Sequence, residues 1–147
     1  MPQVSLVATL VATLVATALG FILGALWYGP LFGKRWMAAV GLTREQIERN
    51  ANPAKIYGTT FVLGLVASYV FGLYLGPNPG RAFAITAGAS AGLCWVATSL
   101  ATNYLFEGRP AALFAINGGY HAVRFTLMGL AFALFVSSFG DRVQKAH

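Results

Sequence analysis

The sequence predicts an all-α integral membrane protein: four transmembrane helices in an antiparallel bundle, with one basic amphipathic loop. Hydrophobic residues make up 57% of the 147 residues and charged residues only 10%, whereas soluble domains carry roughly 25% charged residues. A helix needs about 20 mainly apolar residues to cross a bilayer. Four segments meet this requirement and form one expected membrane domain over 1–147: 4–29, 56–76, 82–105 and 111–138.

The first apolar segment is expected to be a retained transmembrane helix. A cleaved signal peptide begins with basic residues followed by an apolar stretch of roughly 7–15 residues. In this chain the first basic residue is Lys34, and the apolar run from Val4 to Tyr28 is long enough to cross a bilayer. This segment therefore counts as the first span.

Small residues recur at four-residue spacing along three spans and form ridges on single helix faces. Lipid tails are as apolar as the helices, so helices in a bilayer associate mainly through close packing, which small side chains permit. The ridges predict close contacts between helices of one chain, with a seam between subunits as the alternative. The residues are Ala8, Ala12, Ala16, Gly20 and Gly24, then Gly64, Ser68, Gly72 and Gly76, then Ala84, Gly88 and Gly92.

The segment 30–55 is the one long polar connection. The motif W-Y-G-P at 27–30 predicts the end of the first helix at the membrane interface, where aromatic residues gather, because Gly is flexible and Pro lacks an N–H donor. Thr43 and Gln46 have capping-box spacing, which predicts a short solvated helix over 44–50. The basic residues of this connection are Lys34, Arg35, Arg44, Arg49 and Lys55.

Short turns rich in Pro and Gly, at 77–81 and 107–110, predict that the later spans form antiparallel hairpins. Four spans place both termini on one side of the membrane. The connections on the other side carry more Lys and Arg, which predicts a cytoplasmic 30–55 loop and termini outside the cytoplasm. The expected location is a bacterial plasma membrane. The residues from Asp141 onward are expected to form a polar tail.

Polar side chains gather on one face of the fourth span. At 100° per residue, Asn117, His121 and Arg124 share a narrow sector of the helix. Arg124 lies roughly 20 Å along this helix at 1.5 Å per residue, well inside a hydrocarbon core about 30 Å thick. A charge at that depth is costly, so it is expected to face the bundle, a partner group or water.

Asn103 and Glu107 end the third span one helical turn apart, next to the start of the fourth. We therefore predict a polar intramembrane pocket between these spans, with the end of the first span at its mouth and Arg124 in a deeper layer. Asn117-Gly118-Gly119 is expected to loosen the fourth helix, as broken helices do in transporters. The predicted ligand-binding residues are Trp27, Tyr28, Asn103, Glu107, Asn117, Tyr120, His121 and Arg124.

Four interpretations of these residues stay open. The polar side chains form interhelical hydrogen bonds that hold the bundle together, or Arg124 and His121 bind an anionic ligand or lipid head group. Alternatively His121 relays protons, since histidine titrates near neutral pH, or it ligates a haem or a metal. One histidine makes a poor metal site, so no metal and no cofactor is predicted.

Other function classes lack their sequence signals. The net charge of +6 is not arranged as a basic stripe with interleaved aromatics, which disfavours nucleic-acid binding. Cys94 is the single cysteine, so no disulfide forms within one chain. The sequence has four acidic residues and shows no serine–histidine–aspartate arrangement, paired carboxylates or phosphate-cradling glycine loop, so no catalytic residue is predicted.

Three blocks of the sequence are similar to one known family: G-A-L-W-Y-G-P-L-F-G-K-R-W at 24–36, N-Y-L-F-E-G-R-P at 103–110 and L-F-A-I-N-G-G-Y-H at 113–121. Their order and spacing resemble the bacterial membrane family catalogued as domain of unknown function 1761, over nearly the whole chain. The resemblance implies a small four-span membrane protein and brings no established activity. The residues that match its motifs are Trp27, Tyr28, Pro30, Lys34, Trp36, Asn103, Glu107, Asn117, Tyr120 and His121.

Two roles therefore remain for this small membrane protein. The first is a binding or transport module that holds an anionic ligand or lipid in the intramembrane pocket. The second is a structural or accessory subunit of a larger membrane complex, packed through its small-residue ridges. Because the chain is short for a complete transport path, we expect a homo-oligomer or a membrane complex.

Overall fold

The computed structural model describes residues 2–145, with side chains over 6–136. Nearly all of this part of the chain is helical, and it contains no β-strand. The predicted all-α bundle with four spans is confirmed, with span ends that differ from the expected ones by a few residues. The helices long and apolar enough to cross a membrane are Leu6–Leu31, Pro53–Leu75, Arg81–Phe106 and Ala111–Val136.

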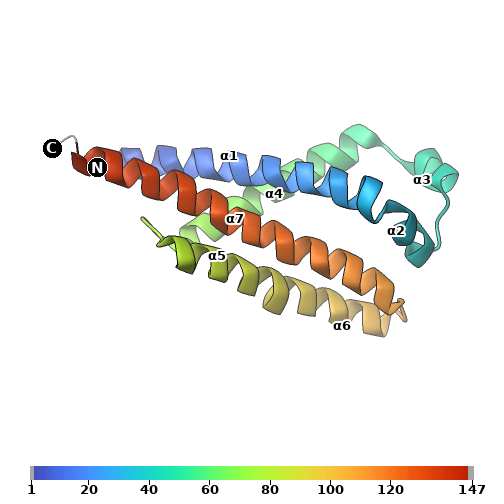
Figure 1. Cartoon of the computed structure of the whole chain (residues 1–147). Helices are drawn as coiled ribbons and strands as arrows, with labels where there is room; N and C mark the ends of the chain where they lie inside the picture. The colour runs from blue at the N-terminus through green and yellow to red at the C-terminus, as the bar shows by residue number, and fades with distance from the viewer. Residues whose placement is uncertain (1, 146–147) are drawn as a thin grey trace.

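The chain order explains which ends of the helices lie together. The elements are α1 (Pro2–Leu26), η1 (Trp27–Leu31), α2 (Gly33–Val40), α3 (Arg44–Asn50), α4 (Pro53–Leu75), α5 (Arg81–Ser90), η2 (Ala91–Ala97), α6 (Thr98–Phe106) and α7 (Ala111–Lys145). The segments η1 and η2 are π-helical, with hydrogen bonds to the carbonyl five residues back. At one end of the bundle α1 begins and α7 ends, whereas α2 and α3 lie at the other end (Figure 1).

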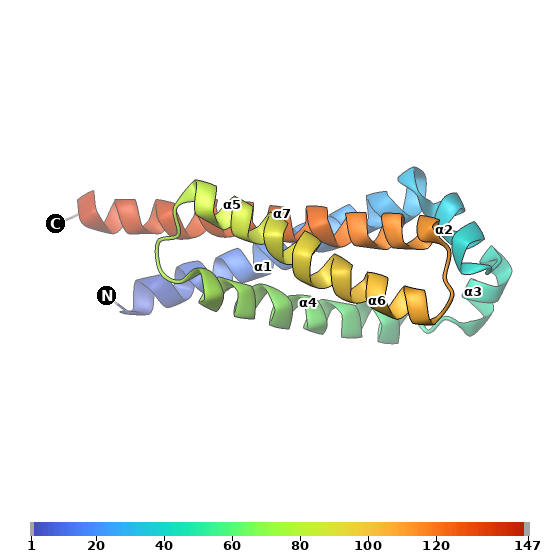
Figure 2. The ribbon, with the colours of Figure 1, turned by 90° about the horizontal axis from the view of Figure 1, so that it is seen from below.

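The fourth span is the centre of the bundle. Helix α7 packs along α1 on one side and along α5 and η2 on the other, while α4 packs against α1. The turn between α6 and α7 lies at the same end as α2 and α3 (Figure 2). The end of the first span and the start of the fourth are therefore neighbours, and we call this half of the bundle the loop-side half.

The residues of the small-residue ridges are buried inside the bundle except for the half-buried Gly24 and Gly76, which confirms the prediction of packing within one chain. A Cβ on Gly88 would collide with the carbonyl oxygen of Phe125, and one on Gly92 would lie 2.6 Å from the carbonyl oxygen of His121. At these crossings the backbones of two helices touch, as dispersion-driven packing in lipid requires. The buried residues of the α1 ridge are Ala8, Ala12, Ala16 and Gly20.

The first span continues past Gly29-Pro30, so its predicted end is wrong by a few residues. Pro30 lies inside η1, and the N–H of Phe32 donates to the carbonyl oxygen of Trp27 at 2.8 Å. A proline is tolerated in a membrane helix when a local π turn gives the freed backbone groups new partners. The Gly-Pro signal therefore changes the helix type here without ending the span.

The polar connection contains two helices. The predicted helix is confirmed as α3, and Thr43 and Gln46 exchange both hydrogen bonds of a capping box. The other helix, α2, was not expected. It ends at Val40 and is followed by Gly41, whose φ of 77° lies in the left-handed region that favours glycine.

Helix α7 is continuous, so the predicted loosening at Asn117-Gly118-Gly119 is wrong. The two glycines instead make room for aromatic rings, because a Cβ on Gly118 would lie 3.2 Å from Phe114 and one on Gly119 would lie 3.1 Å from Trp27. The backbone is also helical from Asp141 to Lys145, where a polar tail was expected.

Candidate functional site

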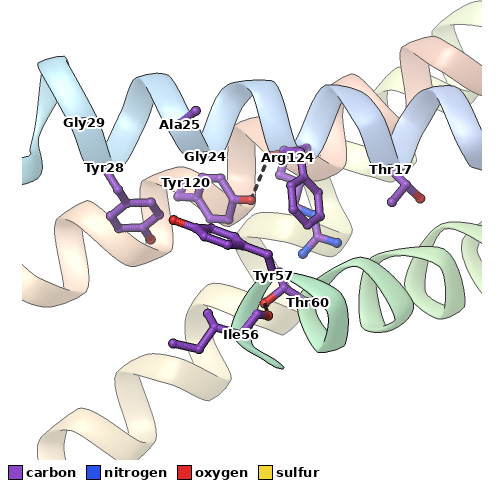
Figure 3. A pocket seen from close by; sticks show the side chains of 12 residues that line it. Thr17, Gly24, Ala25, Tyr28, Gly29, Ile56, Tyr57, Thr60, Tyr120 and Arg124 are labelled. Atoms are coloured by element: carbon purple, nitrogen blue, oxygen red, sulfur yellow. Dashed lines mark hydrogen bonds between the residues drawn. The ribbon is translucent and has the colours of Figure 1, made fainter. Parts of the chain in front are cut away.

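A cavity of about 580 Å³ lies between α1, α4 and α7 in the loop-side half. Helix α1 and η1 contribute a face with three glycines, α4 contributes its first two turns, and α7 contributes Tyr120 and Arg124. Figure 3 shows the side chain of Arg124 between α1 and α4, with Tyr57 reaching across from α4. We call this space the Arg124 cavity.

Arg124 occupies the middle of the fourth span, Ala111–Val136. A Cβ on Gly20 of α1 would lie 3.2 Å from its Nε, and a Cβ on Gly64 of α4 would lie 3.5 Å from its Nη2. Both glycines thus leave a slot for the guanidinium group that a larger residue would narrow. Their positions in the predicted packing ridges did not indicate that they would also leave space for a guanidinium group.

The guanidinium of Arg124 makes no hydrogen bond and no ion pair with any described residue. Its Nε is buried without a partner, although a guanidinium has five N–H donors to satisfy. The ring of Phe125 is 6.0 Å away. Among the described carboxylates, Glu107 pairs with Arg109 in the turn between α6 and α7, and the others lie on α3. No described carboxylate therefore neutralises this charge.

A chain of hydrogen bonds joins three helical elements nearer the loop-side end. The hydroxyl of Tyr28 donates to Asn117 Oδ1 at 2.8 Å, and Asn117 Nδ2 donates to the hydroxyl oxygen of Tyr104 at 2.7 Å. Beside them, Trp27 Nε1 donates to the carbonyl oxygen of Ile116 at 2.9 Å. For Asn117, the structure thus agrees with the interpretation that the polar side chains form hydrogen bonds between helices.

Tyr120 lies between these hydrogen-bonded side chains and Arg124. Its hydroxyl donates to the carbonyl oxygen of Gly20 at 3.1 Å, the dashed line in Figure 3. The centroid of its ring is 5.2 Å from that of Tyr28 and 6.4 Å from that of Trp27. These contacts fix the ring of Tyr120, which also lines the cavity.

The structure brings some predicted site residues into the cavity and not others. Asn103 and Glu107 are exposed at the end of α6 and do not line it. His121 is half-buried and also lies outside the lining, with Nδ1 buried and without a partner among the described residues. The predicted residues that line the cavity are Tyr28, Tyr120 and Arg124.

Sequence reasoning missed the contribution of α4. Tyr57 and Thr60 line the cavity, and a Cβ on Gly64 would lie 3.5 Å from Nη2 of the guanidinium. These residues recur at intervals of three and four, which is the spacing of one helix face. That pattern was available in the sequence. The hydrogen bond that Asn117 donates to Tyr104 could not be recognised in the sequence, because tyrosine is common at membrane interfaces.

Comparison with known proteins gives a family and no further relative. A family model described as "Protein of unknown function (DUF1761)" matches residues 11–133, most of the chain. No curated protein and no solved structure among those compared matches it. The matched range includes the Arg124 cavity and the three sequence blocks that resemble this family. The chain, which has four candidate membrane spans, therefore belongs to the DUF1761 family.

Proposed function

We propose that the chain is a membrane-embedded binding module that holds an anionic amphiphile, a molecule with an anionic head and an apolar tail, in the Arg124 cavity. Arg124 carries this proposal. An arginine is always charged in proteins, and a charge at the centre of a membrane helix costs about 2.5–3.5 kcal/mol on insertion scales. Here the charge sits at mid-span and has no anionic partner in the described part of the chain.

The chemistry of the cavity supports such a ligand. A carboxylate or a phosphate accepts parallel hydrogen bonds from a guanidinium, and the low dielectric of the site strengthens that pair. The hydroxyls of Tyr57 and Tyr120 add polar contacts, while Phe21 and Ile56 offer apolar surface for a tail.

The shape of the cavity gives a route for the ligand. Its lining on the first span runs from Thr17 to Gly29, roughly 18 Å at 1.5 Å per residue. The cavity therefore extends from the middle of the membrane toward the loop-side surface. With the basic 30–55 connection in the cytoplasm of a bacterial plasma membrane, as the excess of Lys and Arg favours, the ligand enters from the cytoplasmic leaflet.

The alternative role, an accessory subunit packed through small-residue ridges, has less support. Those ridges are buried between helices of the same chain or line the Arg124 slot, so they offer little free surface to a second protein. A homo-oligomer stays a prediction.

Thermal unfolding in mild detergent tests the proposed function, with dodecyl phosphate as the anionic probe and dodecanol as the neutral one. At a concentration 100 times its Kd, a ligand stabilises a protein by about 2.7 kcal/mol. We expect dodecyl phosphate to raise the Tm of the wild type, Arg124→Gln to abolish that shift, and Arg124→Lys to reduce it.

The matched control is Arg81→Gln, at an exposed arginine that begins α5 at the opposite end of the bundle. This variant removes the same charge and is expected to keep the full shift. Equal shifts for Arg124→Gln and the wild type would show that the probe binds elsewhere. A shift of equal size with dodecanol would remove the role of the anion.

A further inference from the structure

A second cavity, also of about 580 Å³, lies on the other side of η1, between α2 and the first turns of α7. We call it the α2–α7 groove. It shares no lining residue with the Arg124 cavity, so a ligand in the groove does not depend on one at Arg124. Its walls are methyl groups of two helices: Ala38, Ala39, Ala112 and Ala115.

Aromatic rings and one cation complete the α2–α7 groove. Trp27 and Phe32 line it with ring centroids 4.8 Å apart, and the hydrogen bond from Trp27 Nε1 to Ile116 holds the indole in place. Arg35 is the charged residue of the lining. It is exposed and has no ion pair or hydrogen bond within the described residues.

The position of the groove along the membrane indicates its occupant. The first span ends at Leu31 and the fourth begins at Ala111, so a groove between α2 and the first turns of α7 lies at the membrane interface. At that level a phospholipid presents its phosphate next to its acyl chains. An unpaired guanidinium complements the phosphate, and a trough of methyl groups and indole ring complements an apolar chain.

We propose that the α2–α7 groove seats one anionic phospholipid of the loop-side leaflet, with its phosphate at Arg35 and an acyl chain along the alanines. A lipid with a net negative head group is favoured over a zwitterionic one because no described carboxylate lies in the lining to offset Arg35. Neighbouring basic residues also attract anionic lipids, but this attraction acts over the surrounding surface and is not specific to the groove.

Trp27 offers a direct reporter because it lines the groove. The other two tryptophans, Trp36 and Trp95, are replaced by Phe, and the single-Trp protein is reconstituted into phosphatidylcholine vesicles that contain phosphatidylglycerol with brominated acyl chains. Bromine quenches indole fluorescence on contact. We expect brominated phosphatidylglycerol to quench Trp27 more than the same fraction of brominated phosphatidylcholine does.

Two substitutions on one helix separate a specific site from general surface charge. Arg35→Gln is expected to lower the preference for phosphatidylglycerol about tenfold, the effect of losing one hydrogen bond to a charged group. Lys34→Gln makes the same charge change at an exposed residue outside the lining and is expected to retain most of the preference. Equal losses in the two variants, or no preference in the unsubstituted single-Trp protein, would overturn the proposal.

A steric variant tests the trough independently of charge. Ala115→Phe fills the groove and is expected to reduce quenching by brominated lipid of either head group. The control is Val66→Phe, at an exposed position of α4 away from the groove, which should leave quenching unchanged. Unchanged quenching in Ala115→Phe would show that the acyl chain lies elsewhere.

Discussion

Glycine serves different purposes in two regions of this bundle. Where α5 and η2 cross α7, Gly88 and Gly92 let two backbones touch, and no space remains between them. Where α1 and α4 approach α7 in the loop-side half, Gly20 and Gly64 flank the guanidinium of Arg124. Similar ridges of small residues thus permit dry packing between α5, η2 and α7 and accommodate a charged side chain between α1 and α4. A glycine in a ridge indicates that another group approaches closely, and only the facing helix shows whether that group is a backbone or a side chain.

The largest effect is expected at the backbone crossing. Gly88→Ala places a methyl group against the carbonyl oxygen of Phe125. This is a backbone atom, which cannot move aside as a flexible side chain can. We expect the substitution to lower the free energy of unfolding by about 3 kcal/mol, the upper part of the usual range for overpacking. Denaturant unfolding in mild detergent, followed by far-UV circular dichroism, measures the change.

The matched control for that substitution is Gly58→Ala in α4. A Cβ at this position would meet nothing within 4 Å, so the change should be neutral or stabilise the helix by up to about 1 kcal/mol. Similar stabilities for the Gly88 and Gly58 variants would contradict the tight crossing.

A smaller effect is expected in the Arg124 slot, because a guanidinium side chain can shift where a backbone cannot. Gly20→Ala should be about 1 kcal/mol more favourable in an Arg124→Ala background than in the wild type, a typical coupling between residues in contact. A double-mutant cycle on unfolding free energies measures that difference. Strict additivity of the two substitutions would mean that Gly20 does not restrict Arg124.

The smallest effect is expected at the hydrogen-bonded chain near the interface. Tyr28→Phe removes the bond to Asn117 and should destabilise the protein by about 0.6 kcal/mol, the average for such bonds between membrane helices. Tyr57→Phe is the control, since that hydroxyl has no partner among the described residues. The same unfolding measurement should place the control closer to the wild type, and the reverse order would contradict the network.

The spans and their packing could be predicted from sequence because the bilayer imposes simple requirements. A span must be long and apolar, and helices in lipid must pack through small residues. The depth of Arg124 followed from the rise per residue alone. The π-helical passage through Pro30 could not be predicted, because it depends on partners that neighbouring segments give to freed backbone groups.

The depth of the site residues in the membrane could be predicted from sequence better than the direction in which their side chains point. Asn103, Glu107 and Tyr28 were expected together because their helix ends share one side of the membrane, yet the first two are exposed. Topology gives the height of a residue in the bilayer, whereas the rotation of each helix depends on its neighbours. For the same reason the contribution of Tyr57 was missed: the spacing of Tyr57, Thr60 and Gly64 indicates one face of α4, but it does not indicate that this face packs beside Arg124.

The proposed anion site at Arg124 is best tested by native mass spectrometry of the protein extracted in its own lipid with mild detergent, compared with Arg124→Gln and Arg81→Gln. We predict that the wild type and Arg81→Gln retain anionic molecules at the same fixed stoichiometry and that Arg124→Gln retains one fewer. A wild type that retains no anionic molecule, or an Arg124→Gln variant that retains as many as the wild type, would refute the binding site and leave Arg124 as a structural residue of the bundle.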